Sequence, residues 1–118
     1  MVVRHFRQWA KTAALAADSK KAVQVVVLDV RKESDVTDYL VVAGAESSAQ
    51  LRAVSQAVAE KLHQAGARLS HREGRSPARW IALDYGGLVV HILLSEARRF
   101  YRLENLWEKA RRVRWSSQ

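Results

Sequence analysis

Apolar residues recur at helical spacing in separate regions of the chain. In residues 4–17 one face carries an aromatic and alanine stripe made of Phe6, Trp9, Ala13 and Ala16 or Ala17. After Ser47 or Ser48, either of which suits a helix N-cap, the stripe is aliphatic and consists of Leu51, Val54, Val58 and Leu62. This helix is predicted to end at Gly66, and a last helix is predicted from near Leu103 to about Val113.

Short apolar runs between these helices predict strands. The β-branched run from Val23 to Asp29 predicts a buried strand, and a second strand is predicted from Thr37 or Asp38 to Ala43, ended by Gly44. A short edge strand over 68–71 precedes a loop over 73–78. Residues 80–85 and 88–94 predict a hairpin, because Gly86 and Gly87 tolerate the positive φ that two-residue turns require.

The element order α-β-β-α-β-β-β-α predicts an α/β fold with a mixed sheet of about five strands flanked by helices. The 118 residues suit a single domain over 1–118, with 115–118 expected to fray. No apolar run approaches the roughly 20 residues that cross a bilayer, so no membrane partner is expected. The absence of cysteine excludes disulfides and thiolate metal sites. Although the first helix is basic and amphipathic, we expect it to pack in the domain, and a cytoplasmic location is favoured over an organellar one.

Charge is unevenly distributed along the chain. The net charge is +8, with basic residues concentrated in 1–21 and 98–115 and acidic residues in 29–46. Basic ends favour a polyanionic partner, commonly RNA, because binding releases counterions. A solvated basic face explains the same pattern, so both interpretations remain open.

Catalytic motifs are weak in this sequence. Gly44 ahead of Ser47-Ser48 faintly resembles the glycine-serine loop of nucleotidyltransferases, but the paired carboxylates that hold magnesium are missing and only Asp84 is near. The four histidines lack zinc-binding spacing. His91 and Asp84 fall on adjacent strands, where the carboxylate is expected to raise the histidine pKa, and a core or interface histidine is favoured over a catalytic one. We therefore expect no enzyme activity, no metal and no cofactor.

The run from residue 80 to 107 mixes large aromatic side chains with isolated charges, and this mixture is typical of a protein-binding surface. Its members are Trp80, Asp84, Tyr85, His91, Phe100, Tyr101, Glu104 and Trp107.

Five segments in register over 27–107 resemble the ribosomal silencing factors, also called the Iojap family. The first is VLDVRKESDVTDYLVVAG at 27–44, and the second is Ser47, Gln50 and Arg52 at the start of the long helix. Glu73-Gly74 ahead of Trp80 forms the third. The hairpin strings LDYG (83–86) and VVHI (89–92) form the fourth, and RFYRLENLW (99–107) closes the pattern.

The resemblance implies a fold similar to nucleotidyltransferases without their active site. It implies a protein that binds the large ribosomal subunit at its universal ribosomal protein fourteen and sterically blocks subunit joining, which represses translation. It also implies a role in large-subunit maturation, and a homodimer for several members. An RNA-binding assembly factor without silencing activity stays open as an alternative, and a degenerate nucleotidyltransferase is disfavoured.

The resemblance also implies site residues. Because the ribosomal partner is basic, Asp38, Asp84 and Glu104 are expected to supply complementary charge, and Trp80, Tyr85 and Tyr101 to supply anchors. Tyr39 and His91 complete the expected ribosomal-protein site. As a separate hypothesis, Arg111, Arg112 and Arg114 contact ribosomal RNA.

Some positions depart from the family pattern. Gly87 stands where an aspartate is usual after Tyr-Gly, while Leu40 and Leu93 stand where phenylalanine is common. The two leucines are packing adjustments. Asp29 and Thr37 are expected to stabilise the loop between the first two strands rather than to contact a partner.

Overall fold

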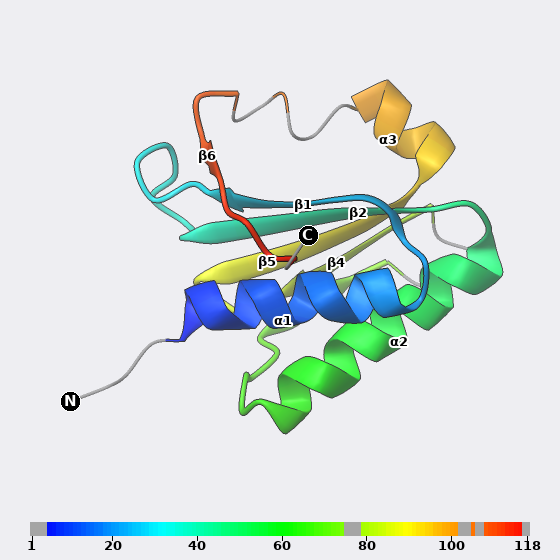
Figure 1. The fold of residues 1–118 in the computed structure, drawn as a ribbon, viewed down its shortest axis with the longest axis horizontal. Helices are drawn as coiled ribbons and strands as arrows, with labels where there is room; N and C mark the ends of the chain where they lie inside the picture. Colours follow the sequence, from blue (N-terminus) through cyan, green and yellow to red (C-terminus); the bar gives the residue numbers. More distant parts are fainter. Residues whose placement is uncertain (1–4, 75–78, 102–104, 106–107, 117–118) are drawn as a thin grey trace.

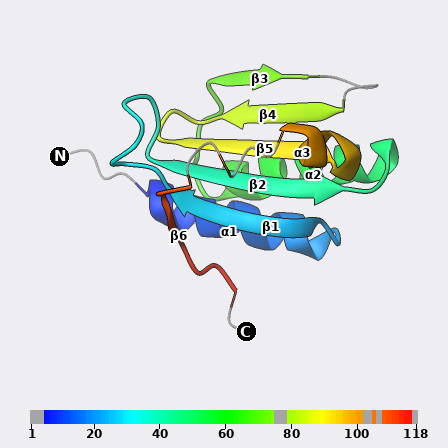
Figure 2. The same cartoon turned by 90° about the horizontal axis from the view of Figure 1, so that it is seen from above.

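The computed structural model describes residues 5–74, 79–101, 105 and 108–116. The elements in chain order are α1 (Phe6–Ser19), β1 (Val23–Asp29), β2 (Tyr39–Ala45), α2 (Ser48–Gln64), β3 (His71–Glu73), β4 (Trp80–Asp84), β5 (Leu88–Leu94), α3 (Ser95–Tyr101) and β6 (Arg111–Arg112). The strands form one six-stranded sheet in the order β3-β4-β5-β2-β1-β6, which Figure 2 shows from above. Only β2 and β5 run parallel; the other neighbours are antiparallel. The predicted mixed α/β sheet is confirmed, with one strand more than expected.

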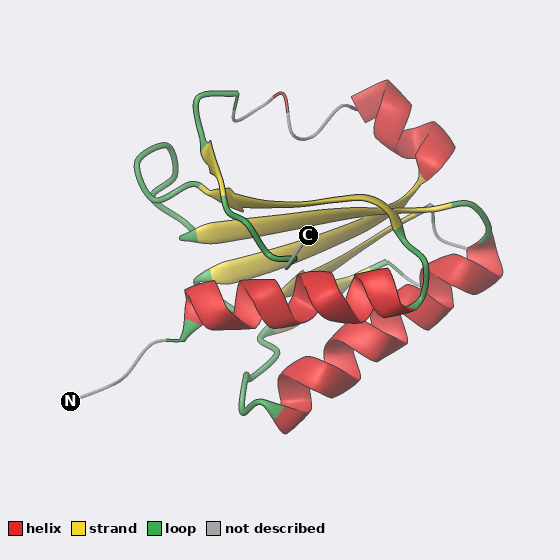
Figure 3. Cartoon of the chain, viewed as in Figure 1, coloured by secondary structure: helices red, strands yellow, loops and turns green. Residues whose placement is uncertain are grey.

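Helices cover the two faces of the sheet unequally. The long helices α1 and α2 lie on one face and the short helix α3 lies on the other, as Figures 1 and 3 show. The main core fills the space under α1 and α2, where the predicted stripe of Leu51, Val54, Val58 and Leu62 is buried. A smaller cluster on the α3 face contains Leu28, Val30, Leu40, Val42, Leu93 and Ala97. We call these two sides the α1 face and the α3 face.

The start of α2 is stabilised by two polar side chains. Ser47 is the N-cap, and its hydroxyl oxygen accepts a hydrogen bond from the Gln50 backbone N–H at 3.1 Å. The Gln50 amide donates to the carbonyls of Lys20 and Lys21, at 3.1 and 2.9 Å, and accepts from the Glu46 N–H. Gln50 therefore ties the α1–β1 connection to α2.

The prediction that Gly44 ends the second strand is wrong. Strand β2 continues through Ala45, because its parallel pairing with β5 extends to the Ala45–Leu94 pair. Gly44 faces Val23 of β1, and a Cβ at this position would lie 2.9 Å from Val23 Cγ2 and 3.1 Å from Val23 O. The glycine allows close approach of the first strand.

The predicted last helix from Leu103 to Val113 is also wrong over its described part. Residues 108–110 form a turn, and β6 pairs with β1 at Asp29–Arg111 and Leu28–Arg112. The Val113 N–H donates to Val27 O, and Val113 is buried. Trp115, where the sequence predicts the start of a frayed tail, is partly buried and donates from Nε1 to Val25 O at 3.1 Å. Backbone groups on the free edge of β1 need partners, and this segment supplies them.

The edge strand and hairpin agree more closely with expectation. The edge strand lies at 71–73 rather than 68–71, and its Ser70 neighbour already donates a backbone hydrogen bond to Asp84 O. The hairpin of β4 and β5 turns at Gly86-Gly87, with the Tyr85 N–H donating to Leu88 O at 2.8 Å. Gly86 has φ +89°, which a two-residue hairpin turn requires.

Gly87 has a packing role that explains its departure from the family pattern. A Cβ at Gly87 would lie 2.3 Å from Cδ2 of Phe6, so the glycine makes room for this α1 ring. We expect Gly87→Asp to lower the free energy of unfolding by about 1–3 kcal/mol, because the ring must move. Urea denaturation of Gly87→Asp, Phe6→Ala and the double variant measures this. In the Phe6→Ala background the aspartate is expected to cost less, and additive costs would contradict the explanation.

Candidate interaction surface

Strands β3, β4 and β5 present a partly exposed patch on the α3 face. Register partners in neighbouring strands share a face, so His71, Asp84 and Val89 form one row and Glu73, Ala82 and His91 form the next. Trp80 pairs with Leu93 and packs, together with Val89, against the cluster on the α3 face. We call this patch the hairpin surface; it consists of His71, Glu73, Trp80, Ala82, Asp84, Val89 and His91.

A hydrogen bond joins two ring side chains of the hairpin surface, Trp80 and His91. The indole N–H of Trp80 donates to Nδ1 of His91 at 2.9 Å, and the rings meet edge to face with centroids 5.5 Å apart. They are diagonal neighbours on adjacent antiparallel strands, which brings large side chains within reach. Because Nδ1 accepts, the neutral imidazole carries its proton on Nε2. The bond fixes the orientation of the partly exposed indole.

The net pKa shift of His91 is opposite to the expected direction, although Asp84 acts on it as expected. The pKa of His91 is lowered to about 4, because burial disfavours the charged imidazolium, while the Asp84 carboxylate acts in the opposite direction without prevailing. Asp84 is instead engaged by the hairpin turn, where its Oδ1 accepts a hydrogen bond from the Gly86 N–H at 2.8 Å. His91 is therefore neutral near pH 7.

Asp38 lies at the same end of the sheet as Asp84. Its backbone N–H donates to Gly87 O at 3.1 Å, and its carbonyl accepts from the Val30 N–H at 2.9 Å. The adjoining loop is built as the sequence predicts. Asp29 accepts hydrogen bonds from Arg31, which lowers the pKa of the carboxyl, and buried Thr37 donates to Tyr39 O at 3.4 Å. One end of the sheet thus collects two carboxylates, Asp38 and Asp84, from separate segments.

One expected anchor, Tyr85, and one further residue of the expected site, Tyr39, lie elsewhere. Tyr39 and Tyr85 are 5% and 6% exposed and belong to the main core on the α1 face. Burial also raises the pKa of Tyr85. Their side chains are therefore placed on the opposite side of the sheet from Trp80 and His91. The side chain of Tyr101 and all of Glu104 lie outside the described residues.

The three arginines expected to contact RNA do not share one face. Arg111 pairs with Asp29 and Arg112 pairs with Leu28, so neighbouring residues of β6 point to opposite faces. Leu28 belongs to the cluster on the α3 face, so Arg112 lies on that face and Arg111 on the α1 face. All three, including Arg114, are exposed.

Four residues of the hairpin surface were not identified from the sequence, namely His71 and Glu73 on β3, Ala82 on β4 and Val89 on β5. The exposed side chains of His71 and Glu73 are joined by a hydrogen bond of 2.7 Å on the sheet edge, and Ala82 and Val89 are the register partners of His91 and Asp84. Period-two alternation from the Gly86-Gly87 turn identifies Ala82 and Val89, since the turn sets the register. No sequence signal sets the register of β3.

None of the described helices is long and apolar enough to cross a membrane. Within the same residues, no three acidic or histidine side chains gather where they could hold a metal ion.

Comparisons with known proteins agree with one another. The family model described as "Ribosomal silencing factor during starvation" matches residues 3–118. The ribosomal silencing factor of Bacillus subtilis is 34% identical over 100 residues, covering 85% of each chain. A mouse protein named for mitochondrial assembly of the ribosomal large subunit is 30% identical over 91 residues, covering 75% of this chain and 40% of that protein.

The fold is also found in solved structures. A crystal structure of a Chromobacterium violaceum protein superposes with a TM-score of 0.85 at 30% identity, covering 89% of this chain and 88% of that chain. A second crystal structure, from Bacillus halodurans, has a TM-score of 0.79 at 30% identity and covers 92% and 98%. The match extends over nearly the whole chain, and the chain belongs to the family of ribosomal silencing factors.

Proposed function

We propose that this protein binds the large ribosomal subunit at its universal ribosomal protein fourteen and sterically blocks subunit joining, thereby repressing translation. The observation that carries the proposal is the family match over residues 3–118. Such a role needs a binding surface rather than a catalytic centre, and a cytoplasmic protein of bacterial type fits it.

The hairpin surface is the proposed contact with the ribosomal protein. Trp80 provides a partly exposed aromatic side chain whose orientation is fixed by His91, which reduces the entropy lost on binding. Asp84 and Asp38 add negative charge at one end, which suits a basic partner. Tyr39 and Tyr85 support this surface from the opposite face of the sheet instead of contacting the partner.

Replacing Trp80 with alanine is expected to weaken large-subunit binding at least about tenfold, because it removes the largest anchor. Sucrose-gradient sedimentation of purified subunits with the protein measures both binding and the loss of joined ribosomes. Leu15→Ala is the matched control, since Leu15 is an exposed apolar residue of α1, 51% exposed.

In the same assay, Asp84→Asn tests the negative charge of this residue without removing its hydrogen bond to the turn. Asparagine retains an oxygen that accepts the Gly86 N–H but removes the negative charge. We expect weaker binding with unchanged thermal stability. The proposed contact would be refuted if Trp80→Ala and Asp84→Asn bound the large subunit as tightly as Leu15→Ala does. Absence of large-subunit binding by the unmodified protein at low salt would refute the proposed function itself.

A second candidate function is large-subunit assembly without silencing, with direct binding of ribosomal RNA. The mouse relative is named for such assembly, and the exposed Arg112 beside the α3 face offers a phosphate contact. The same gradients distinguish the two: an assembly factor binds the subunit but leaves joined ribosomes intact. Sedimentation velocity of the isolated chain tests the homodimer that the family resemblance implies.

A further inference from the structure

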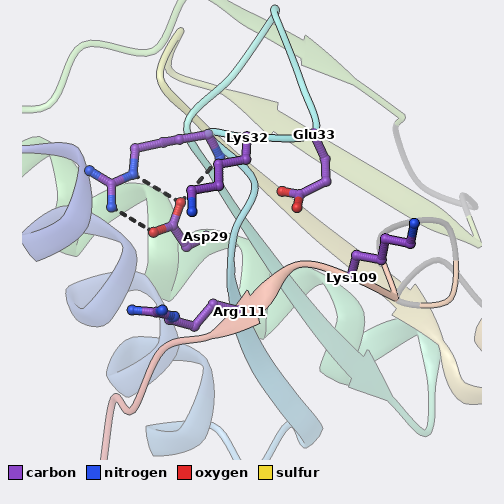
Figure 4. Close-up of a pocket in the computed structure, with 6 residues that line it drawn as sticks. Asp29, Lys32, Glu33, Lys109 and Arg111 are labelled. Atoms are coloured by element: carbon purple, nitrogen blue, oxygen red, sulfur yellow. Dashed lines mark hydrogen bonds and ion pairs between the residues drawn. The ribbon is translucent and has the colours of Figure 1, made fainter.

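A hollow of about 450 Å³ lies between the β1–β2 loop and β6. Strand β6 forms the edge of the sheet opposite to β3, so the hollow is far from the hairpin surface along the strand order. Six side chains line it: Asp29, Arg31, Lys32, Glu33, Lys109 and Arg111. Figure 4 shows Lys32 and Glu33 extending from the loop, with Lys109 and Arg111 bordering the hollow from the β6 side. Its size falls in the range of small-molecule sites. We call it the loop pocket.

The charges of the loop pocket are only partly compensated. Arg31 donates to both carboxylate oxygens of Asp29, at 2.9 and 2.7 Å, so these two charges neutralise each other. Over the described chain, no ion pair joins Lys32, Lys109 or Arg111 to a carboxylate. Lys32, Lys109 and Arg111 line the same hollow as Glu33, which leaves an excess of two positive charges around it. An excess of positive charge around one hollow favours an anionic ligand.

Glu33 narrows the class of ligand. An anionic group without a hydroxyl, such as a phosphodiester, has no donor for an acceptor-only carboxylate. A ribonucleotide carries both an anionic acceptor and a hydroxyl donor. Its phosphate accepts hydrogen bonds from lysine and arginine, and its ribose hydroxyls donate to a carboxylate. A deoxyribonucleotide within a strand lacks the 2′-hydroxyl donor. The mixture of cations with one carboxylate thus fits a phosphodiester joined to ribose better than a phosphodiester joined to deoxyribose.

We propose that the loop pocket binds a ribonucleotide, with Lys32, Lys109 and Arg111 holding the phosphate and Glu33 accepting a hydrogen bond from a ribose hydroxyl. The inference does not depend on the hairpin surface or on the silencing function. It differs from a general basic face, because it requires particular residues from two segments about 80 positions apart and predicts discrimination between RNA and DNA.

Fluorescence anisotropy with an eight-nucleotide single-stranded RNA, and with DNA of the same sequence, tests the proposal on the full chain. The double variant Lys109→Ala/Arg111→Ala is expected to bind RNA about tenfold more weakly, and its salt slope is expected to fall by about 1. Lys61→Ala/Arg68→Ala is the matched control. It removes two exposed cations outside the loop pocket, on α2 and in the segment after it.

Glu33→Ala tests the ribose contact. Removing this negative charge is expected to strengthen DNA binding more than RNA binding, so that the ratio of RNA to DNA affinity falls toward 1. Glu60→Ala, an exposed glutamate on α2, is expected to leave that ratio unchanged.

Adenosine 5′-monophosphate as a competitor identifies the source of the ribonucleotide. Displacement of RNA from the unmodified protein assigns the pocket to free nucleotides as well as strands, whereas failure to displace assigns it to the strand backbone. The proposal is overturned if the loop-pocket double variant binds RNA like its Lys61/Arg68 control. It is also overturned if Glu33→Ala and Glu60→Ala have the same ratio of RNA affinity to DNA affinity. Circular dichroism of each variant establishes that it is folded.

Discussion

Lowering the pH from 6.5 to 4 is expected to reduce the free energy of unfolding by about 3 kcal/mol through His91 alone. The pKa of His91 is about 4 in the folded protein, against 6.5 for an unperturbed histidine. In this window the unfolded chain binds a proton that the folded chain does not, so stability rises with pH. The contribution is fully present above pH 6.5 and is lost as the pH falls toward 4.

The surroundings of His91 support this direction. Burial is the dominant cause of the lowered pKa, and protonation at Nδ1 would place an N–H against the Trp80 indole N–H. Asp84 on β4 is the charged group that opposes the shift, and Glu73 on β3 lies in the same row as His91. Asp29, whose pKa is also lowered, contributes stability that is lost only below its ordinary pKa of 3.8, outside this window.

Urea denaturation at pH 7 and pH 4.5 measures the effect, with His91→Asn as the comparison. The variant is expected to lose most of the pH dependence in this range. The ring resonances of His91 give its pKa directly by NMR, and a value near 6.5 would contradict the burial argument.

Replacing Gly74 with alanine is expected to lower the free energy of unfolding by about 2–4 kcal/mol. Gly74 has φ +90°, and a Cβ there would lie 2.3 Å from the carbonyl oxygen of Trp80 and 3.2 Å from Cα of Ile81. Both neighbours are backbone atoms of β4 and cannot rotate away. The substitution would force β3 and β4 apart at the point where the hairpin surface begins.

Gly66 provides a matched control for Gly74. It has nearly the same φ, +91°, but nothing lies within 4 Å of a Cβ built there. Gly66→Ala therefore reports backbone strain alone, about 1 kcal/mol, and the difference between the two variants reports the clash. Equal costs in thermal or urea denaturation would show that the close approach to Trp80 is unimportant. Subunit binding should also weaken for Gly74→Ala and not for Gly66→Ala.

The sequence determined most of the fold and the family. The stripe of Leu51, Val54, Val58 and Leu62, the Ser47 cap and the Gly86-Gly87 turn are local signals, readable from spacing and from backbone preference. The five segments of the family pattern extend across the chain in order, and they are sufficient to indicate the family of ribosomal silencing factors without any tertiary contact.

Tertiary structure decided what depends on contacts between distant segments. β6 replaced the predicted helix because the edge of β1 offers unpaired backbone groups, and this long-range pairing leaves no local trace. Tyr39 and Tyr85 belong to the core because of the face on which strand alternation places them, although their residue type suits an interface equally well. The His91 pKa fell instead of rising because burial outweighed one nearby carboxylate, and the degree of burial is a property of the packed molecule.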